Sequence, residues 1–309
     1  MNAKNFSRIF GNGVQLPVSS LEGAGLLTFG NVFYVDSGVG SDSANNGKSY
    51  KKPFATVDGA IGHTTANNGD VILVLPGHDE NPTASISADV AGVRIIGLGN
   101  STDRPTFTFG AAGAALDISA AGVHVSGLRF DLGTVAATVT NAINITADGA
   151  IVEDCETVPH ATSQFTNLLT ATDSQFVHIL NNRFHGLETA SGTSGVVLDG
   201  CDDLVMVGND IQGHFTEHAV DNTTPASADE ILRAYIANNS IRNASTTAGD
   251  LAIELDANAT GMFIGNMLSG GLATTAANYD IGNMASLESY IVDDSGIDVH
   301  GIVLGTAAT

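Results

Sequence analysis

The sequence predicts an all-β protein folded as a right-handed parallel β-helix, a solenoid with coils of about 27 residues. The first observation behind this prediction is a motif of eight residues that recurs seven times. Its copies are Val93–Asn100, Val123–Phe130, Ala150–Thr157, Val177–Phe184, Leu204–Ile211, Ala234–Ile241 and Gly261–Leu268. The fifth residues of successive copies are 30, 27, 27, 27, 30 and 27 positions apart: Gly97, Gly127, Asp154, Asn181, Gly208, Asn238 and Gly265.

The second observation is the composition of the motif's columns. The third position is apolar in every copy, and the sixth is asparagine in the last four. A short strand followed by a bend that contains Asn or Gly fits a coil of parallel strands, in which stacked asparagines can hydrogen-bond from one coil to the next. A helical repeat would need a different apolar spacing, and a β-sandwich would not require a regular step. The predicted ladder residues are Asn182, Asn209, Asn239 and Asn266.

The third observation is a second apolar run ahead of several copies, which gives two or three short strands per coil. These runs are Ala115–Ile118, Ala142–Ile145, Val196–Leu198 and Ala252–Leu255. Each coil advances by roughly 4.8 Å, so seven or more coils predict a rod on the order of 35–50 Å long.

The composition agrees with a solenoid, and the net charge limits the kinds of partner that it can bind. The chain has 309 residues and 36 glycines, and its formal net charge is −22. All four lysines (Lys4, Lys48, Lys51 and Lys52) lie in the first 52 residues. A rod with this much negative charge is expected to repel nucleic acid and anionic membranes. We therefore expect neither as a partner. It also disfavours polyanionic substrates.

The chain carries no sign of a disulfide, a leader or a membrane span. Cys155 and Cys201 are 46 residues apart and fall at different positions of the repeat, which predicts small buried residues and no disulfide. No basic-then-apolar leader opens the sequence, and no run of 18 apolar residues occurs. We therefore expect no export by the usual route and no membrane span.

Residues 1–30 show no period and contain two of the eleven cations, Lys4 and Arg8. Such a segment is either disordered or an arm laid on a partner, and we expect the arm. The solenoid is then expected to occupy residues 31–268. Within it, Val32–Asp36 predicts a strand, Pro53–Ile61 a short capping helix, and Gly69–Gly77 a buried strand. A cap is expected because an open solenoid end exposes unpaired backbone.

Residues 31–77, with FYVDSGVGSDSANNGKSYKKPFATVDGAI followed by GDVILVLPG, resemble the opening of pectate-lyase-like right-handed β-helix proteins. The stretch Gly122–Phe130 is similar to the same superfamily. The resemblance implies the fold for roughly residues 31–268. These solenoids serve enzymes, adhesins and phage virion proteins alike, so it implies much less about function. The combination of an N-terminal arm, a small acidic coil and no leader looks most like phage structural proteins, namely capsid decoration (cement) proteins or tailspikes.

Three clusters could carry chemistry. Asp199, Asp202 and Asp203 with His214 resemble the paired aspartates and Gly-His of polygalacturonase-type hydrolases, in which two carboxylates act as acid and base. The Arg-x-Lys that follows in that family is missing here. The alternative is aspartates at solvated coil bends, where they bond local N–H groups.

The other two clusters concern metals. His214, Glu217 and His218 form an HxxEH pattern on a loop, and Asp154, Glu156 and His160 could hold calcium. The alternative for the first cluster is a pair of surface histidines. The alternative for the second is a stacked ion pair of Arg183 with Glu156. No Ser-His-Asp set, phosphate loop or redox motif occurs. We predict no metal, no cofactor and no catalytic residue.

After Leu268 the repeat fades. We expect a loop-rich segment over 270–286, then two strands, Ser289–Asp293 and Ile297–Leu304, around the turn 294–296. Residues 269–309 would form a C-terminal cap.

The outer face of the repeat strand predicts the assembly. If the first and third positions of the motif face the core, the second and fourth face outward. From Ile151 onward these outward columns are largely apolar, which a soluble monomer rarely tolerates. We therefore predict a homotrimer that packs through this sheet. The predicted interface residues are Leu180, Val205, Val207, Tyr235, Met262 and Ile264.

The resulting functional expectation is a non-enzymatic structural protein of a phage virion, a trimeric capsid decoration protein that contacts the major capsid protein through residues 1–30. The alternatives are a tailspike-type polysaccharide depolymerase and a glycan-binding adhesin.

Overall fold

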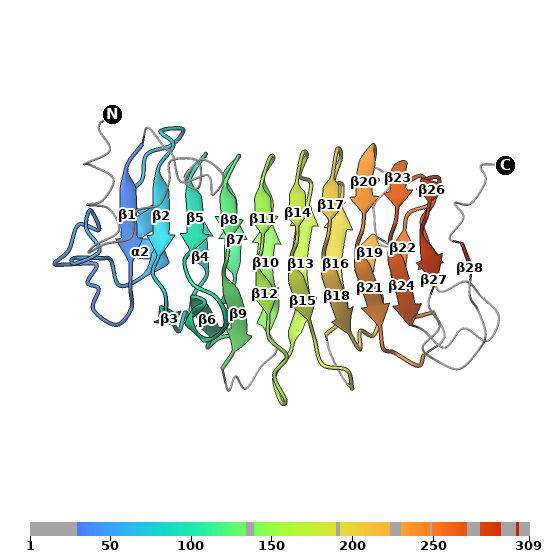
Figure 1. The fold of residues 1–309 in the computed structure, drawn as a ribbon, viewed down its shortest axis with the longest axis horizontal. Coiled ribbons are helices and arrows are strands. Elements are labelled where there is room, and N and C mark those ends of the chain that lie inside the picture. The colour runs from blue at the N-terminus through green and yellow to red at the C-terminus, as the bar shows by residue number, and fades with distance from the viewer. Residues whose placement is uncertain are drawn as a thin grey trace.

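The computed structural model describes residues 30–133, 139–189, 192–222, 230–247, 249–270, 279–291 and 301–302. Almost all of the described regular structure is β-strand, arranged as three long parallel sheets that form the faces of a solenoid (Figure 1). The chain visits sheet 1, then sheet 2, then sheet 3 and returns to sheet 1 one coil further on. The parallel β-helix predicted from the repeat is confirmed.

Sheet 1 has ten strands in the order of the chain and contains the first strand of each of the seven motif copies. Its strands are β1 (Val32–Val35), β2 (Val71–Val74), β5 (Arg94–Gly97), β8 (His124–Ser126), β11 (Ile151–Glu153), β14 (His178–Leu180), β17 (Val205–Val207), β20 (Ala234–Ala237), β23 (Gly261–Ile264) and β26 (Ala285–Leu287). The parallel register pairs His178 with Val205 and Val205 with Tyr235, which are the predicted steps of 27 and 30 residues.

Sheet 2 also has ten strands and follows sheet 1 in each coil. They are β3 (Asp79–Glu80), β6 (Thr106–Phe109), β9 (Arg129–Leu132), β12 (Glu156–Thr157), β15 (Arg183–His185), β18 (Asp210–Gly213), β21 (Ser240–Asn243), β24 (Met267–Gly270), β27 (Tyr290–Ile291) and β28 (Gly301–Ile302). All neighbours are parallel except β27 and β28, which are antiparallel.

Sheet 3 has eight strands and contains the apolar runs that precede the motif. They are β4 (Ile86–Ala88), β7 (Leu116–Ile118), β10 (Val139–Ile145), β13 (Phe165–Thr172), β16 (Ser194–Asp199), β19 (Val220–Asn222), β22 (Ile253–Leu255) and β25 (Tyr279–Asp280). The prediction of more than one strand per coil is therefore correct, and most coils have three.

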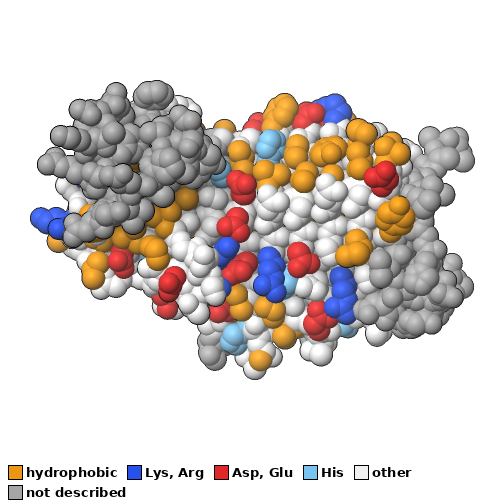
Figure 2. All heavy atoms as spheres, in the orientation of Figure 1, with side chains coloured by type: hydrophobic (Ala, Val, Ile, Leu, Met, Phe, Trp, Pro, Cys, Tyr) orange, Lys and Arg blue, Asp and Glu red, His pale blue; other side chains and the backbone are white. Residues whose placement is uncertain are grey.

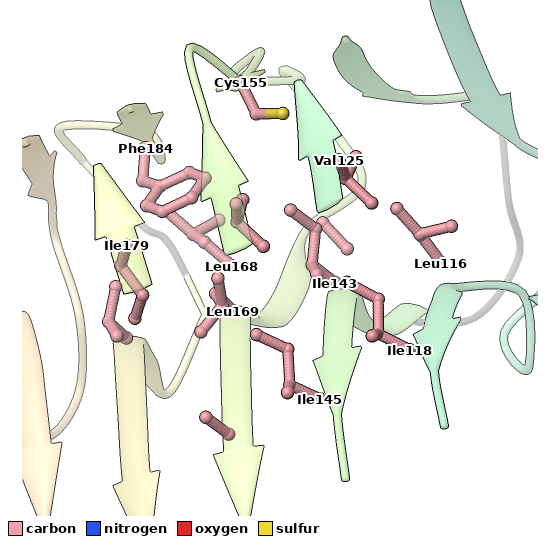
Figure 3. Close-up of a cluster of buried hydrophobic side chains, with 14 of the residues drawn as sticks. Leu116, Ile118, Val125, Ile143, Ile145, Cys155, Leu168, Leu169, Ile179 and Phe184 are labelled. Carbon is pink, nitrogen blue, oxygen red and sulfur yellow. The ribbon is translucent and has the colours of Figure 1, made fainter. Parts of the chain in front are cut away.

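The core fills the space between the three sheets. The third position of every motif copy is fully buried, as the strand alternation requires. Figure 3 shows Val125 from sheet 1, Leu169 from sheet 3 and Phe184 from sheet 2 pointing into one interior. Cys155 and Cys201 are free and buried there, and burial raises the pKa of both thiols to about 12.

The bend after each sheet 1 strand explains the marker column of the motif. From Gly127 to Gly265 the fifth residue always has a positive φ, for example 54° at Asn181 and 72° at Gly208. Glycine adopts this conformation at no steric cost, and asparagine and aspartate tolerate it best among the others. The column therefore alternates among Gly, Asn and Asp.

The next residue forms a buried ladder along the rod. Asn209 is buried, and its Oδ1 accepts from the backbone N–H of Asn182 (2.9 Å) and from Asn182 Nδ2 (3.0 Å). Its own Nδ2 donates to the Ile179 carbonyl (2.8 Å) and to Asn239 Oδ1 (2.9 Å). The same pattern links Asn239 to Asn266. Cys155 begins the ladder by donating its N–H to Asn182, and Ser289 ends it by accepting from Asn266.

Two expectations about the ends need correction. The helix α2 (Val57–Ile61) starts later than expected after Pro53, because Phe54 is extended and bridges Val35. The helix lies against β1, β2 and β4, and a role in closing the solenoid end stays a prediction. A 3-10 turn, η2 (Ser101–Asp103), is the other helical element among the described residues.

The loop-rich segment expected over 270–286 contains the short strand β25 and the start of β26, and its residues 271–278 lie outside the described residues. The coil geometry continues there although the motif is not recognisable in the sequence. Glu288 adopts the positive φ of the bend (50°), and Ser289 occupies the ladder position. The two predicted C-terminal strands are represented by β27 and β28, whereas residues 292–300 lie outside the described residues. Residues 1–29, which carry most of the predicted arm, also lie outside them.

Candidate functional site

The outer face of sheet 1 carries an apolar surface over its C-terminal half, here called the apolar face. It consists of outward side chains on β14, β17, β20, β23 and β26, visible as a row of hydrophobic side chains in Figure 2. Tyr235 is 40% exposed, Met262 43% and Leu287 53%. The structure places the six predicted interface residues on this face, the other four being half-buried: Leu180, Val205, Val207 and Ile264. Leu287 was missed because the repeat was expected to end before it.

A polar segment on β5, β8 and β11 bounds the apolar face. Before it, the outward side chains of β1 and β2 are apolar, and a second buried cluster joins Tyr34, Val71, Leu73 and Ile96. Arg94, His124, Ser126 and Glu153 point outward from β5, β8 and β11. His124 Nε2 lies 3.4 Å from Glu153 Oε2. Burial, helped by the nearby Arg94, lowers the pKa of His124. The change from charged to apolar side chains falls across β11 and β14, whose outward residues are Ile151, Glu153, His178 and Leu180.

The outer face of sheet 2 carries the charged band, defined by Arg104, Arg129, Glu156, Arg183, His185 and Asp210. Arg129 Nε binds Glu156 Oε1 at 2.6 Å, and Arg104 binds Asp154 at 3.0 Å. His185 Nε2 lies 2.8 Å from Asp210 Oδ2. In Figure 2 the blue and red side chains of this surface lie below the hydrophobic row.

A hollow of about 430 Å³ lies on the charged band, lined in part by Asp131, Glu156, Arg183 and His185. Arg183 is in register with Glu156, as expected, but the expected ion pair between them is not found among the described residues. Glu156 pairs instead with Arg129 of the preceding coil, at 2.6 Å, and with Arg104 at 3.8 Å. The repeat columns could have revealed this band, since Arg129, Glu156, Arg183 and Asp210 occupy one column.

The structure does not bring the four alternative catalytic residues together. Asp199, Asp202 and Asp203 lie where the chain turns from sheet 3 to sheet 1, whereas His214 follows β18 of sheet 2. Asp202 and Asp203 both bind Arg233, at 3.2 and 2.8 Å, and Asp202 accepts from the Leu232 N–H. The geometry matches the alternative interpretation of aspartates that stabilise coil bends.

The two candidate metal clusters are also dispersed. His218 Nε2 pairs with Glu254 at 3.1 Å, and its Nδ1 accepts from the Leu251 N–H. His160 Nδ1 accepts from the N–H groups of its own turn. Across the described part of the chain, no three His, Cys, Asp or Glu side chains are grouped to hold a metal ion. No helix among the described residues is long and apolar enough to cross a membrane.

The three-faced stack of parallel strands makes this chain a parallel β-solenoid, the fold that the N-terminal resemblance implies. No family model and no curated protein matches the sequence. Solved structures with a similar fold include the Streptococcus pneumoniae surface protein and adhesin PfbA, at 10% identity over 74% of this chain and 88% of that one (TM-score 0.37). Another is the Dettilon tailspike protein gp208, at 14% identity over 91% of this chain and 68% of that one (TM-score 0.36).

A third is an alginate lyase from Paenibacillus sp. str. FPU-7, at 12% identity over 81% of this chain and 99% of that one (TM-score 0.33). Identity this low concerns the fold alone, and these proteins differ among themselves in activity. Function must therefore be argued from the surfaces of this chain.

Proposed function

We propose that the protein is a non-enzymatic structural component of a phage virion, a homotrimer that decorates the capsid. The observation that carries this proposal is the apolar face, which runs along five consecutive strands of sheet 1. Residues 1–30 would attach the trimer to the major capsid protein, because they hold two of the few cations and lack the repeat.

We propose that a second and a third copy of the chain cover the apolar face. The face is straight, lies parallel to the rod and is bounded by charged residues at one end, so three rods can lie side by side with sheet 1 inward. Closed symmetry of this kind covers the apolar side chains of every copy. Burying each large side chain contributes at most about 1.5–3 kcal/mol, and less where the residue is already half-buried.

The double substitution Val207→Asp with Ile264→Asp tests this interface. Both side chains are half-buried on the outer surface, so the carboxylates can stay solvated in a monomer but not between packed sheets. We expect soluble monomers with an unchanged β-sheet circular dichroism spectrum. Ser126→Asp, on the polar segment of the same sheet, is the matched control and should stay trimeric. A wild-type protein that sediments as a monomer would contradict the proposal.

The position in the particle is tested separately. Antibody labelling or cryo-electron microscopy of intact virions should place the protein on the shell. Density on the tail alone would replace the decoration role by that of a tailspike.

A tailspike-type depolymerase or glycan-binding adhesin is the second candidate, and the hollow on the charged band favours it. Glu156 and Asp131 supply carboxylates around the hollow of about 430 Å³, and His185, which pairs with Asp210, supplies an imidazole. We expect no release of reducing ends or unsaturated products from host capsule. Product release that is lost on Glu156→Gln, with Asp202→Asn unaffected, would establish the enzyme and place its site on sheet 2.

A further inference from the structure

The first three strands of sheet 1 carry an apolar cluster on the outer surface of the solenoid, here called the N-terminal patch. It consists of Tyr34 on β1, Val71 and Leu73 on β2, and Ile96 on β5. The alternate residues of the same strands belong to the main core, so the patch points away from that core. The three strands lie side by side at one end of the rod (Figure 1), and the polar segment separates the patch from the apolar face.

The side chains of the N-terminal patch are buried although they point outward. Val71 is 1% exposed and Leu73 is 3% exposed. Val205 and Leu180 occupy the same two columns of sheet 1 further along the rod, each between two neighbouring strands, and both are only half-buried. Burial also raises the pKa of the Tyr34 hydroxyl. Position on the sheet therefore does not account for the burial of the patch, and another part of the molecule must cover it.

No other described element supplies an apolar cover. Within the described part of the chain, the further hydrophobic side chains packed against the patch are Val32, Leu75 and Leu98. Val32 belongs to β1, and the two leucines directly follow β2 and β5, so all three extend the patch along its own strands. The burial is present in a single chain, so a second copy is not needed to produce it.

The segment ahead of β1 has the composition that such a cover needs. Residues 14–29 read VQLPVSSLEGAGLLTF, and Glu22 is their only charged residue. Both cations of the N-terminal region, Lys4 and Arg8, precede this stretch. Seven of its residues are large and apolar: Val14, Leu16, Val18, Leu21, Leu26, Leu27 and Phe29. The apolar and the cationic parts of the N-terminal region are therefore separate in the sequence.

The same segment is long enough and enters at the right place. The described chain begins at Gly30, two residues before the first residue of β1. The patch spans two strand spacings, roughly 10 Å, whereas sixteen extended residues span at most about 55 Å. We propose that residues 14–29 of the same chain fold back over the N-terminal patch and cover the outer face of β1, β2 and β5. Residues 1–13, with both cations, would remain available to a partner, so this inference does not depend on the proposed function.

Photo-cross-linking of the purified full-length chain tests which segment covers the patch. p-Azidophenylalanine in place of Tyr34 keeps the size of the side chain, and the same replacement of Tyr235, an outward tyrosine on β20, is the matched control. From position 34 we expect a cross-link within one chain, to a chymotryptic peptide from residues 14–29. Position 235 should give no cross-link to that segment. Cross-links from position 34 to a second chain, or to residues 30–302 alone, would overturn the proposal.

Thiol accessibility measures the cover itself. Leu73→Cys places a thiol in the patch, and Ser126→Cys places one in the same column on the polar segment. Both native cysteines are buried, so the introduced thiol dominates the reaction with N-ethylmaleimide. In the full-length chain Ser126→Cys should react at least tenfold faster than Leu73→Cys. Equal rates would show that the patch is open and would overturn the proposal.

Substitutions in the segment connect the two observations. Leu16→Asp, Leu21→Asp and Leu26→Asp together place three carboxylates along the segment, and a carboxylate is strongly disfavoured against an apolar surface. Combined with Leu73→Cys they should raise its reaction rate at least tenfold, with an unchanged β-sheet circular dichroism spectrum. Combined with Ser126→Cys they should leave the rate as it is. If Leu73→Cys stays protected beside the three aspartates, the cover comes from another part of the chain and the proposal is wrong.

Discussion

The asparagine ladder allows one substitution to be worked through from the structure. Asn209→Ala removes a carboxamide that makes four buried side-chain hydrogen bonds. Two of its partners keep other bonds: Asn182 Nδ2 still donates to the Val152 carbonyl, and Asn239 Oδ1 still accepts from the Asn209 N–H. The Asn182 N–H and the Ile179 carbonyl lose the bond that Asn209 gave them.

The Ile179 carbonyl also belongs to the parallel ladder between β14 and β17, so the Asn182 N–H is the group that is left without a partner. An unpartnered buried N–H costs about 1–3 kcal/mol and each lost hydrogen bond somewhat less, so Asn209→Ala should lower the free energy of unfolding by about 2–4 kcal/mol. Asn209→Ser should lose less, about 1–2 kcal/mol, because a hydroxyl can both accept and donate. Ser289 already does this at the end of the ladder, where its Oγ accepts from Asn266 and donates to the Phe263 carbonyl.

Urea unfolding at fixed protein concentration, followed by circular dichroism, measures these losses as shifts of the midpoint. Asn258→Ala is the control, because Asn258 is exposed and its side chain binds only Glu230 among the described residues. It should change stability by less than about 0.5 kcal/mol. Equal losses for Asn209→Ala and Asn209→Ser, or a loss near zero for both, would refute the reasoning.

Three further predictions concern pH, thiols and the N-terminal segment. Burial raises the pKa of the Glu254 carboxyl in the folded state, so the folded state binds this proton more tightly, and stability is lost as pH rises from the unfolded pKa through the folded pKa. The stability that Glu254→Gln gains over the wild type should therefore grow between pH 4 and pH 7. A stability difference that stays constant over this range would count against the prediction. Burial raises the pKa of the Cys155 and Cys201 thiols to about 12, so iodoacetamide at pH 8 should label neither thiol in the native protein. Both thiols should be labelled in urea. Labelling of the native protein would show that the coils open. Deleting residues 1–30 should leave a folded solenoid that no longer joins the particle, and unchanged incorporation would exclude the anchoring role.

The fold could be predicted because each coil repeats the same physical requirements. The buried third position, the positive φ of the fifth and the ladder at the sixth leave a visible period in the sequence. The repeat was lost after Leu268 because Glu288 and Ser289 satisfy the bend and the ladder with unexpected side chains. Column geometry, more than residue identity, is what a solenoid preserves.

The candidate sites were harder to predict because they depend on which columns meet across coils. The apolar face was visible, since alternation within one strand assigns each side chain to a face. A hollow between sheet 3 and sheet 1 is lined by Asp173, Gln175, Asp202 and Glu230, which come from three successive corners, and no single stretch contains its pattern. Asp202 and Asp203 looked catalytic because the cation that pairs with them, Arg233, lies 30 residues later in the sequence.

The interior of the rod is held by two different systems that overlap in one coil. Toward the N-terminus, Phe107, Phe109, Phe130 and Phe165 contact one another at centroid distances of 5.9–6.1 Å. Toward the C-terminus the amide ladder takes over, beginning at Cys155. Phe165 and Cys155 belong to the same coil, so every boundary between these coils is crossed by ring contacts or by ladder hydrogen bonds. In a nearest-neighbour array the weakest junction opens first, so fraying under heat or mechanical load should start at the two ends and leave this central coil until last.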